Sequence, residues 1–434
     1  MVSGVTDTAR QDVAMSSFAA AVDRIKGNQI LAVPASFIQR CADALGLTGR
    51  DRVLTPVVTT HLALSRVLHG GTAISHLCHL TPHEFTPSAY CQAIARLPEA
   101  FFATLQTSVT GQIRRDQSED CWHGHRVFLI DGTGISMPDT PALQAAFGQP
   151  PGQAKGCGFP VVHLLALFDA HSGYLLRTQL APLRTHDLAH AVTMHGAMRT
   201  GDILVGDRAF GSFAHLASLQ QRGLHGLFRL PQRRPHGTAW DRHVVYEKSA
   251  QKPSWMTAAA YAKLPATSTV REVRVKVKLP GCRVQHLVLV TTLLDQSRYP
   301  AKELAKLYKL RWRIENDLRD LKITLGMDIL KSKTVAGVNK EVQLFSIVYN
   351  LVRRVMVDAA DHQGVAVDRI SFVDALRWLT HAKPDDTVPE LIVNPERPGR
   401  FEPRVKKRRP KQYPLMKKPR NVLKQEMLEQ RLAA

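Results

Sequence analysis

The segment RVFLIDGTG (residues 126–134) joins a short apolar run to an aspartate and then to a Gly-Thr-Gly turn signal. An apolar run bounded by turn residues predicts a buried β-strand, here one that ends on Asp131. The segment DILVGD (202–207) repeats the pattern and predicts a second strand that ends on Asp207. A helical pattern at 187–199 precedes the second strand. Strands that alternate with helices and end on acids predict an α/β layer.

Further elements are expected on both sides of these two strands. The segments 161–173, 174–183 and 226–231 predict three more strands, and 211–222 suits another helix. Residues 15–118 show helical periodicity without strand-like alternation. From 232 to 299 the pattern is β without helix, because two alternating segments flank a Pro-Gly-Cys turn and predict a hairpin.

One amphipathic helix is expected at 302–325, ended by Gly326. At 100° per residue its apolar side chains form one stripe, made of Leu307, Leu310, Ile314, Leu318, Leu321 and Leu325. A polar face ~60° wide borders the stripe and carries Tyr308, Arg311, Glu315 and Lys322. Two other acids, Asp317 and Asp320, are expected to face solvent. Glu315 is therefore the carboxylate of this helix that the pattern places at the rim of the sheet.

Asp131, Asp207 and Glu315 together predict a metal-binding active site. Two divalent cations roughly 3.5–4 Å apart can activate an attacking oxygen and stabilise a leaving oxygen in phosphodiester chemistry. Mg²⁺ prefers oxygen ligands such as carboxylates. A single aspartate after a strand is more often a turn or cap residue. The prediction therefore depends on the combination of the three acids.

Three other aspartates compete for these roles. Asp139 and Asp169 lie past their strands in turn-like contexts. Asp202 precedes its strand and would lie at the wrong end of the sheet. The pattern therefore favours the first set of acids.

The charge of the chain points to a polyanionic partner. Its 434 residues include 58 Lys and Arg against 37 Asp and Glu, a net charge of +21. Residues 396–434 hold 13 of the basic residues and 4 acids, with a dense run at Lys406, Lys407, Arg408 and Arg409. Prolines in this tail forbid a continuous helix, but its side chains can neutralise phosphates without a fold.

Composition also excludes several classes. No stretch of 18 apolar residues exists, so no membrane span and no membrane partner are expected. The N-terminus lacks an apolar signal region, and the six cysteines form no C-x-x-C pair, which is typical of a reduced cytosol. The groupings His76, Cys78, His79 and Cys121, His123, His125 lack the matching second pair of a zinc site.

These patterns divide the chain into five parts. We expect a helical domain at 1–120, the first part of the α/β core at 121–231 and a β-strand insertion at 232–299. The second part of the core, with the glutamate-bearing helix, is expected at 300–385, and a basic, proline-rich tail at 386–434. No internal repeat is present.

The polar helix face carries a resemblance to a known family. The spacing Tyr308-x2-Arg311-x3-Glu315-x6-Lys322 resembles the Y-R-E-K signature of bacterial DDE transposases of the insertion-sequence "IS-four" family. The segments LIDGTGISMPDTPALQAAFGQP (129–150) and LVGDRAFGSF (204–213) look like that family's first and second aspartate blocks. The segment RFEPRVKKRRPKQYPL (400–415) resembles the basic tail of one of its branches. The likeness extends over roughly residues 30–420.

The resemblance implies an RNase H-like catalytic core with an inserted β-subdomain, preceded by the helical domain at 1–120, which would bind DNA. It also implies that Asp131, Asp207 and Glu315 hold two Mg²⁺ or Mn²⁺ ions. Tyr308, Arg311 and Lys322 would contact phosphates of the transposon end, and Arg208 would join them. The activity implied is cleavage of double-stranded DNA at the ends of an insertion sequence, followed by strand transfer into target DNA. The implied active form is a homodimer on two ends, in the bacterial cytoplasm at the nucleoid.

One departure from the family affects the hairpin intermediate that some members use. Those relatives stack a flipped base on a tryptophan of the insertion, at a position that falls near Leu287 here. No tryptophan lies there, and Trp240 and Trp255 are elsewhere in the insertion. Two other functions stay open: a non-catalytic or domesticated DNA-binding protein of transposase origin, and an endonuclease that never joins strands.

Overall fold

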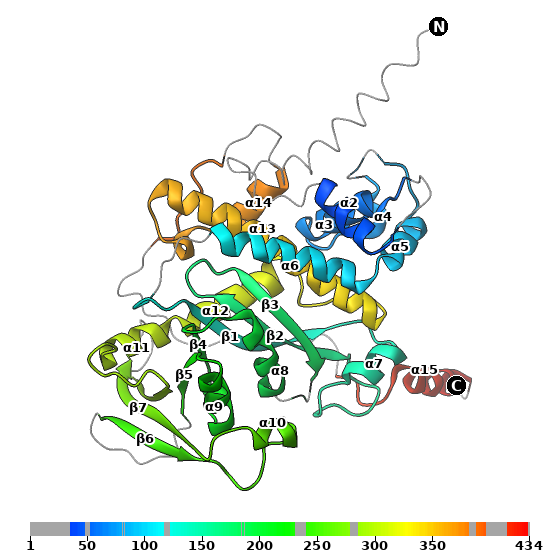
Figure 1. Ribbon diagram of the computed structural model, residues 1–434. Helices are drawn as coiled ribbons and strands as arrows, with labels where there is room; N and C mark the ends of the chain where they lie inside the picture. The colour runs from blue at the N-terminus through cyan, green and yellow to red at the C-terminus, as the bar shows by residue number, and fades with distance from the viewer. Residues whose placement is uncertain are drawn as a thin grey trace.

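The computed structural model (Figure 1) describes eleven stretches of the chain. They are residues 35–47, 53–79, 81, 83–116, 122–183, 185, 187–230, 240–277, 285–381, 388–395 and 415–432. The basic run at 406–409 and the expected hairpin turn at 280–282 lie outside the described residues.

An eight-stranded sheet runs through the molecule in the order β3-β2-β1-β4-β5-β8-β7-β6. Its first five strands are β1 Val127–Ser136, β2 Val161–Asp169, β3 Leu175–Pro182, β4 Ile203–Gly206 and β5 His225–Arg229. Strands β1, β2 and β3 are antiparallel neighbours, whereas β1, β4 and β5 run parallel. This order and these directions are those of the RNase H-like fold, so the expected fold class is confirmed.

The insertion extends the same sheet. Its strands β6 Asp241–Glu247, β7 Thr267–Val277 and β8 Gln285–Thr291 are antiparallel, and β8 pairs with β5 of the core. The expected pairing of the two alternating segments is confirmed by β7 and β8. The expectation of β structure without helix was wrong, because α10, Ala258–Ala262, lies between β6 and β7 and buries Tyr261.

Strand β1 is longer than its sequence predicts. The Gly-Thr-Gly segment after Asp131 continues the strand to Ser136 instead of turning. The reason is the long antiparallel partner β2, which pairs with β1 from Phe128 to Ser136. Cross-strand pairing outweighs the local turn preference of the two glycines. Asp131 therefore lies within a strand, opposite Ala166, and not at its end.

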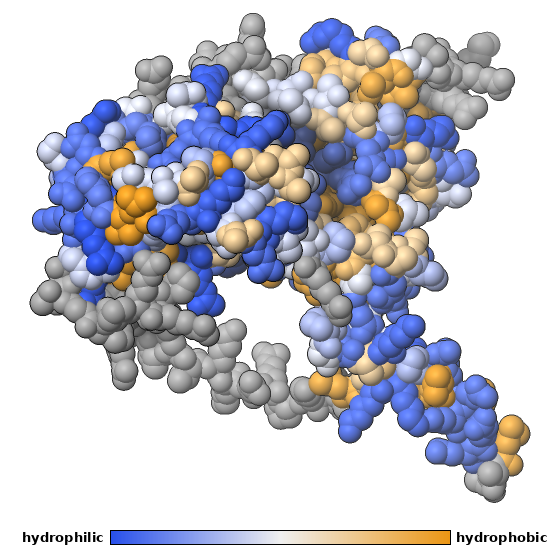
Figure 2. Space-filling model, turned by 60° about the horizontal axis from the view of Figure 1, so that its bottom comes forward, coloured by the Kyte–Doolittle hydropathy of each residue, from blue (hydrophilic) through white to orange (hydrophobic). Residues whose placement is uncertain are grey.

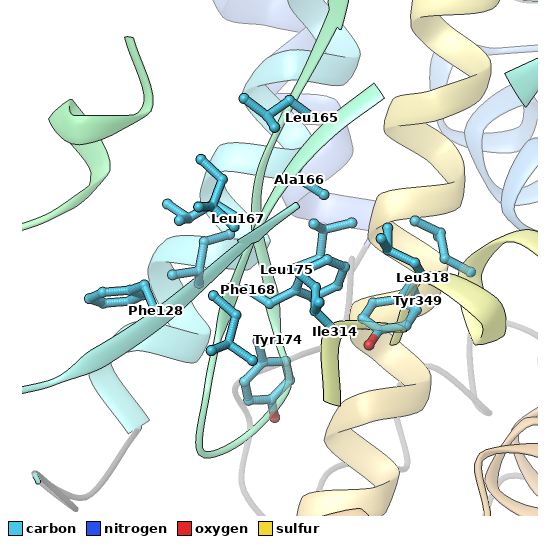
Figure 3. Close-up of a cluster of buried hydrophobic side chains, with 14 of the residues drawn as sticks. Phe128, Leu165, Ala166, Leu167, Phe168, Tyr174, Leu175, Ile314, Leu318 and Tyr349 are labelled. Atoms are coloured by element: carbon cyan, nitrogen blue, oxygen red, sulfur yellow. The ribbon is translucent and has the colours of Figure 1, made fainter. Parts of the chain in front are cut away.

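Helices cover both faces of the sheet. Helix α8, Asp187–Met194, packs on β2 from one side, and α9, Phe213–Gln221, packs on β5. On the other side lie α12, Arg311–Arg319, and the long α13, Val335–Gln363. Figure 3 shows this second contact, in which Ile314 and Leu318 of α12 and Tyr349 of α13 meet Phe168 of β2.

The N-terminal helices dock on α13. They are α2 Ala35–Ala44, α3 Pro56–Leu68, α4 Ile74–Leu77, α5 Pro87–Arg96 and α6 Glu99–Asp116. Side chains of α2, α3 and α6 belong to the same hydrophobic cluster as the sheet. Lys340 of α13 donates from Nζ to the carbonyl oxygens of Ile94 and Ala95 at 3.1 Å each, which satisfies the C-terminal end of α5. In the described stretches before residue 117 the elements are all helical, as expected.

The remaining helices are α7 Pro141–Phe147, α11 Ala301–Lys309, α14 Phe372–His381 and α15 Arg420–Leu432. Helix α15 has no buried residue, and it projects beside α7 in Figure 1. Figure 2 shows this projecting segment with apolar side chains among hydrophilic ones. Met427, Leu428 and Leu432 are among its exposed apolar residues. In the part of the chain that the structure describes, no helix is long and apolar enough to cross a membrane.

Candidate active site

The parallel register of β1 and β4 brings the two aspartates together. Leu129 of β1 pairs with Val205 of β4, and Asp131 and Asp207 each follow two residues later. Parallel neighbours lie about 4.8 Å apart, so the two carboxylates lie side by side at the carboxyl end of β4. Asp207 follows β4 directly, as the sequence predicts.

Each aspartate uses one oxygen locally. Asp131 Oδ1 accepts the backbone N–H of Gly132 at 2.8 Å. Asp207 caps the short 3-10 turn Arg208–Phe210, and its Oδ1 accepts the N–H of Ala209 at 2.7 Å. These bonds hold both carboxylates in place and leave Oδ2 of each to the shared site.

The glutamate-bearing helix is not continuous. The expected helix at 302–325 is broken at Leu310 into α11 and α12, and α12 passes into a π-helical turn, Asp320–Thr324. The expected apolar stripe is confirmed for Leu307, Ile314, Leu318, Leu321 and Leu325, which are all buried, whereas Leu310 at the break is only half-buried. Because α12 packs on β1, the exposed Glu315 lies on the helix that covers the strand of Asp131.

A single arginine connects two of the carboxylates. Arg311 Nη2 lies 2.9 Å from Glu315 Oε1, and Nη1 lies 3.7 Å from Asp131 Oδ2. The pKa of Asp131 is nevertheless raised, first by burial and further by the negative charges of Asp207 and Glu315. The charges of Asp207 and Glu315 thus act on Asp131 across the edge of the sheet, and a positive charge added there would favour its ionised form.

Tyr308 contacts Arg311 from the interior of the protein. Its side chain is buried, with 2% of its surface exposed, so the structure does not present it to DNA as the family resemblance implies. Burial raises the pKa of its hydroxyl to about 12, and that hydroxyl hydrogen-bonds Arg311. The Arg311 guanidinium also lies 5.3 Å from the ring of Trp312. Tyr308 is thus placed to orient Arg311.

Lys322 reaches the same strand from the π-helical turn. Its Nζ donates to Thr133 Oγ1 at 2.9 Å and to the Gly134 carbonyl at 2.8 Å. Burial lowers the pKa of Lys322. Thr133 lies two residues after Asp131 and therefore on the same face of β1. The ammonium group is consequently held at the border of the acid cluster.

Arg208 and the basic tail complete the predicted set. Arg208 is exposed on the turn that Asp207 caps, next to the cluster. Lys406, Lys407, Arg408 and Arg409 lie outside the described residues. The structure thus brings together seven of the predicted residues, Asp131, Asp207, Arg208, Tyr308, Arg311, Glu315 and Lys322.

The competing aspartates are engaged elsewhere. Asp169 Oδ1 accepts two backbone N–H groups and the Ser172 hydroxyl in the turn between β2 and β3. Asp202 forms a 2.7 Å ion pair with Arg126. Asp139 accepts a hydrogen bond from Gln144 at 2.8 Å. Each carboxylate has a local structural task.

Asp317 and Asp320 were expected to face solvent, and that expectation was wrong. Asp317 is buried, 3.5 Å from Arg353 Nη1 and 3.2 Å from the Tyr349 hydroxyl. Asp320 keeps only 13% of its side-chain surface exposed. The reason is α13, which brings Tyr349 and Arg353 against the helix face that a single-helix pattern leaves open.

The three carboxylates are of the ligand type that divalent cations bind. In this structure the Arg311 guanidinium contacts two of them, those of Asp131 and Glu315. Carboxylate oxygens are the ligands that Mg²⁺ and Mn²⁺ prefer. Among the described residues, no three His, Cys, Asp or Glu side chains are grouped closely enough to hold a metal ion. Metal binding by these three carboxylates would require the Glu315 side chain to move toward the aspartates and Arg311 to move away from them.

Comparison with known proteins identifies the family of the chain. The family model described as "Transposase DDE domain" matches residues 122–351, about half of the chain. The chain is 26% identical to the transposase InsG for insertion sequence element IS4 of Escherichia coli K12, over 76% of this chain and 78% of that protein. It is 25% identical to the transposase for insertion sequence element IS231B of Bacillus thuringiensis, over 34% of this chain and 28% of that protein.

A solved structure of a piggyBac transposase synaptic complex with hairpin DNA is similar at a TM-score of 0.45. It shares 10% identity, over 84% of this chain and 79% of that chain. From the family match, which covers more than half of the chain, the chain belongs to the DDE transposases, which are DNA-cleaving enzymes. Membership of this family implies a DNA partner and dependence on a divalent metal ion.

Sequence reasoning missed the residues that support the site. Thr133 holds Lys322, and Gly132 leaves room for His163 on the opposite face of β1. The Asp-Gly-Thr-Gly segment was interpreted as a turn, so no role was assigned to its residues. The alternation of small residues along β1 is the signal that could have identified them.

Proposed function

We propose that the chain cuts DNA at the ends of an insertion sequence and joins those ends to target DNA. The main support is geometric: Asp131 and Asp207 follow paired residues of neighbouring parallel strands, and Arg311 contacts both Asp131 and Glu315. The names of the IS4 and IS231B relatives connect such a chain to insertion sequences.

In this proposal the three carboxylates hold two Mg²⁺ or Mn²⁺ ions. The ions would activate the attacking oxygen and stabilise the leaving oxygen of the phosphodiester. Oδ1 of each aspartate accepts a backbone N–H, so Oδ2 would bind the ions, that of Asp131 after Arg311 moves away. Glu315, exposed on α12, would supply the third carboxylate when its contact with Arg311 opens.

The basic residues around the acids would hold the DNA backbone. Arg311, Lys322 and Arg208 lie beside the carboxylates, where charge builds on phosphate oxygens during the reaction. We propose that Tyr308 orients Arg311 from the interior. Lys406, Lys407, Arg408 and Arg409 would add contacts to phosphates that do not depend on sequence.

We further propose that the helices of residues 1–120 recognise the ends and that two chains bind two ends together. The shared hydrophobic cluster of α2, α3, α6 and the core supports a rigid connection between recognition and cleavage. The enzyme would act on bacterial DNA at the nucleoid. A hairpin intermediate is not part of the proposal, because Leu287 is buried in β8 and Trp240 is covered by Arg242 at 4.3 Å.

A plasmid assay tests this function. The donor carries a marker between the DNA segments that flank the gene, and a second plasmid serves as target. With Mg²⁺ the purified full chain should release the marker and join it to the target. Cleaved but unjoined ends would indicate an endonuclease, and binding without cleavage under Mg²⁺ or Mn²⁺ would indicate a DNA-binding protein. Either result would overturn the proposal.

A further inference from the structure

A pair of buried histidines lies directly behind the turn that carries Asp207. His215 of α9 is fully buried, and His195, in the 3-10 turn His195–Ala197, is 1% exposed. Their rings stack with centroids 5.1 Å apart and an angle of 25° between planes. Buried polar groups are retained when their hydrogen bonds are satisfied, so the partners of these rings indicate their task.

The hydrogen bonds form a chain that ends on the turn. His215 Nδ1 lies 2.8 Å from the carbonyl oxygen of Phe210, the last residue of the turn Arg208–Phe210. A carbonyl only accepts, so His215 Nδ1 carries the proton and donates. His215 Nε2 is then an acceptor, and it lies 3.0 Å from His195 Nε2, which must donate to it.

An unpaired nitrogen of His195 agrees with this assignment of the ring protons. His195 Nδ1 is left without a proton and is buried without a hydrogen-bond partner. Both rings are neutral in this arrangement, because each carries one proton. Burial lowers the pKa of His195 to about 2 and that of His215 to about 4, so neither ring is charged near neutral pH.

The turn Arg208–Phe210, which the histidine pair holds, is packed tightly against the end of β4. A Cβ placed on Gly206 would lie 2.8 Å from the Phe210 ring and 3.0 Å from Ile130. Phe210 therefore folds under the end of β4, immediately before Asp207. At the other end of the turn, Asp207 Oδ1 accepts the Ala209 N–H. Displacement of the Phe210 carbonyl would consequently shift Asp207.

We infer that His215, supported by His195, is a positioning residue that holds Asp207 in its metal-binding orientation. The inference rests on the proposed role of Asp207 as a metal ligand. Direct hydrogen-bond partners of metal ligands commonly contribute about 10- to 100-fold to metal affinity, and we expect the lower value for His215, which bonds the Phe210 carbonyl. The pair acts through the backbone of the Asp207 turn and does not contact the metal site.

Four substitutions test this inference. His215→Leu removes the donor to Phe210 but keeps an apolar side chain, and His215→Asn keeps an N–H close to the position of Nδ1. Leu219→Ala is the matched control, because Leu219 is buried on the same helix and packs over Gly226, away from the turn. Asp207→Asn tests the metal ligand itself.

The measurement is Mn²⁺ binding to the full chain bound to an end-containing DNA duplex, followed by electron paramagnetic resonance. We expect His215→Leu to weaken Mn²⁺ binding about 10-fold or more, and His215→Asn to restore it to near the wild-type value. Leu219→Ala should lower the melting temperature and leave Mn²⁺ affinity unchanged. Wild-type affinity in His215→Leu, or equal weakening in Leu219→Ala, would overturn the inference.

The fourth variant, Asp207→Asn, distinguishes failure of the positioning role from failure of the proposed ligand set. If Asp207→Asn weakens Mn²⁺ binding and His215→Leu does not, the positioning role alone fails. If Asp207→Asn binds Mn²⁺ like the wild type, the proposed ligand set fails and the positioning role fails with it.

A second measurement does not depend on the folding of any variant. Nitrogen NMR of the histidine-labelled wild-type chain should show the proton of His215 on Nδ1 and that of His195 on Nε2. The opposite tautomer on His215 would overturn the inference.

Discussion

Nη2 of Arg311 lies 2.9 Å from Oε1 of Glu315, one helical turn further along α12. The same guanidinium reaches Oδ2 of Asp131 at 3.7 Å. One cationic side chain thus stands between two proposed metal ligands that come from different elements. A metal ion and Arg311 are therefore expected to compete for these carboxylates. When the metal binds, Arg311 would pair with a DNA phosphate instead.

The first prediction concerns that competition. Arg311→Gln should strengthen Mn²⁺ binding to the DNA-free chain, because a positive charge leaves the site. The effect should be up to about fivefold, since Glu315 is 57% exposed and exposed ion pairs contribute about 1 kcal/mol at most. Binding of the same variant to DNA should weaken. Mn²⁺ titration checks this, and unchanged or weaker Mn²⁺ binding would contradict the competition.

The second prediction concerns Thr133. Thr133→Val keeps the shape of the side chain but removes the acceptor for Lys322 Nζ. Loss of one hydrogen bond to a charged donor should lower the DNA cleavage rate by about 10-fold, which is ~1.5 kcal/mol. Thr104→Val is the control, because Thr104 lies on α6 and its hydroxyl donates only within that helix. Equal cleavage rates in the two variants would refute a role for Thr133.

The third prediction concerns the strand that carries Asp131. A Cβ at Gly132 would lie 2.5 Å from Cε1 of His163, whose ring is paired with Asp187. Gly132→Ala should therefore reduce the free energy of unfolding by about 1–3 kcal/mol. Adding His163→Ala should recover part of that loss, since the clash disappears. Denaturant unfolding of the single and double variants measures the coupling, and strictly additive effects would argue against the close contact.

The fourth prediction concerns the buried acid behind the site. Burial raises the pKa of Asp317 to about 6, against about 3.9 in an unfolded chain. The native state therefore binds a proton on Asp317 more tightly than the unfolded chain does. The stability that this proton provides is present at low pH and is lost as the pH rises from about 4 to about 6. Asp317→Asn should remove that component. The melting temperatures of the wild type and Asp317→Asn are measured at pH 4.5 and at pH 6.5. If the two proteins differ in melting temperature by the same amount at both pH values, the raised pKa of Asp317 is contradicted.

Sequence reasoning predicted the parts of the site that depend on local pattern. The strands of Asp131 and Asp207 and the helix face of Glu315 follow from short apolar runs and from 100° periodicity. The stripe of α11 and α12 is buried as predicted except at Leu310, because Leu310 keeps helical backbone angles, φ −59° and ψ −25°, across the break.

Other features depend on partners that are distant in the chain. The burial of Asp317 follows from Arg353 on α13, and the extension of β1 follows from its pairing with β2. The contact of Lys322 Nζ with β1 likewise joins residues that lie far apart in the chain. The histidine pair was not identified because His195 and His215 belong to different elements.

The central claim is that Asp131, Asp207 and Glu315 act as one metal-dependent cleavage site. A nicking assay on DNA with the sequences that flank the gene tests it most directly, using Asp131→Asn, Asp207→Asn, Glu315→Gln and the control Asp139→Asn. In Mg²⁺ or Mn²⁺ the first three should each lose about 100-fold or more in cleavage rate while they still bind the DNA, and the control should cut like the wild type. Wild-type cleavage by any of the first three variants would contradict the claim.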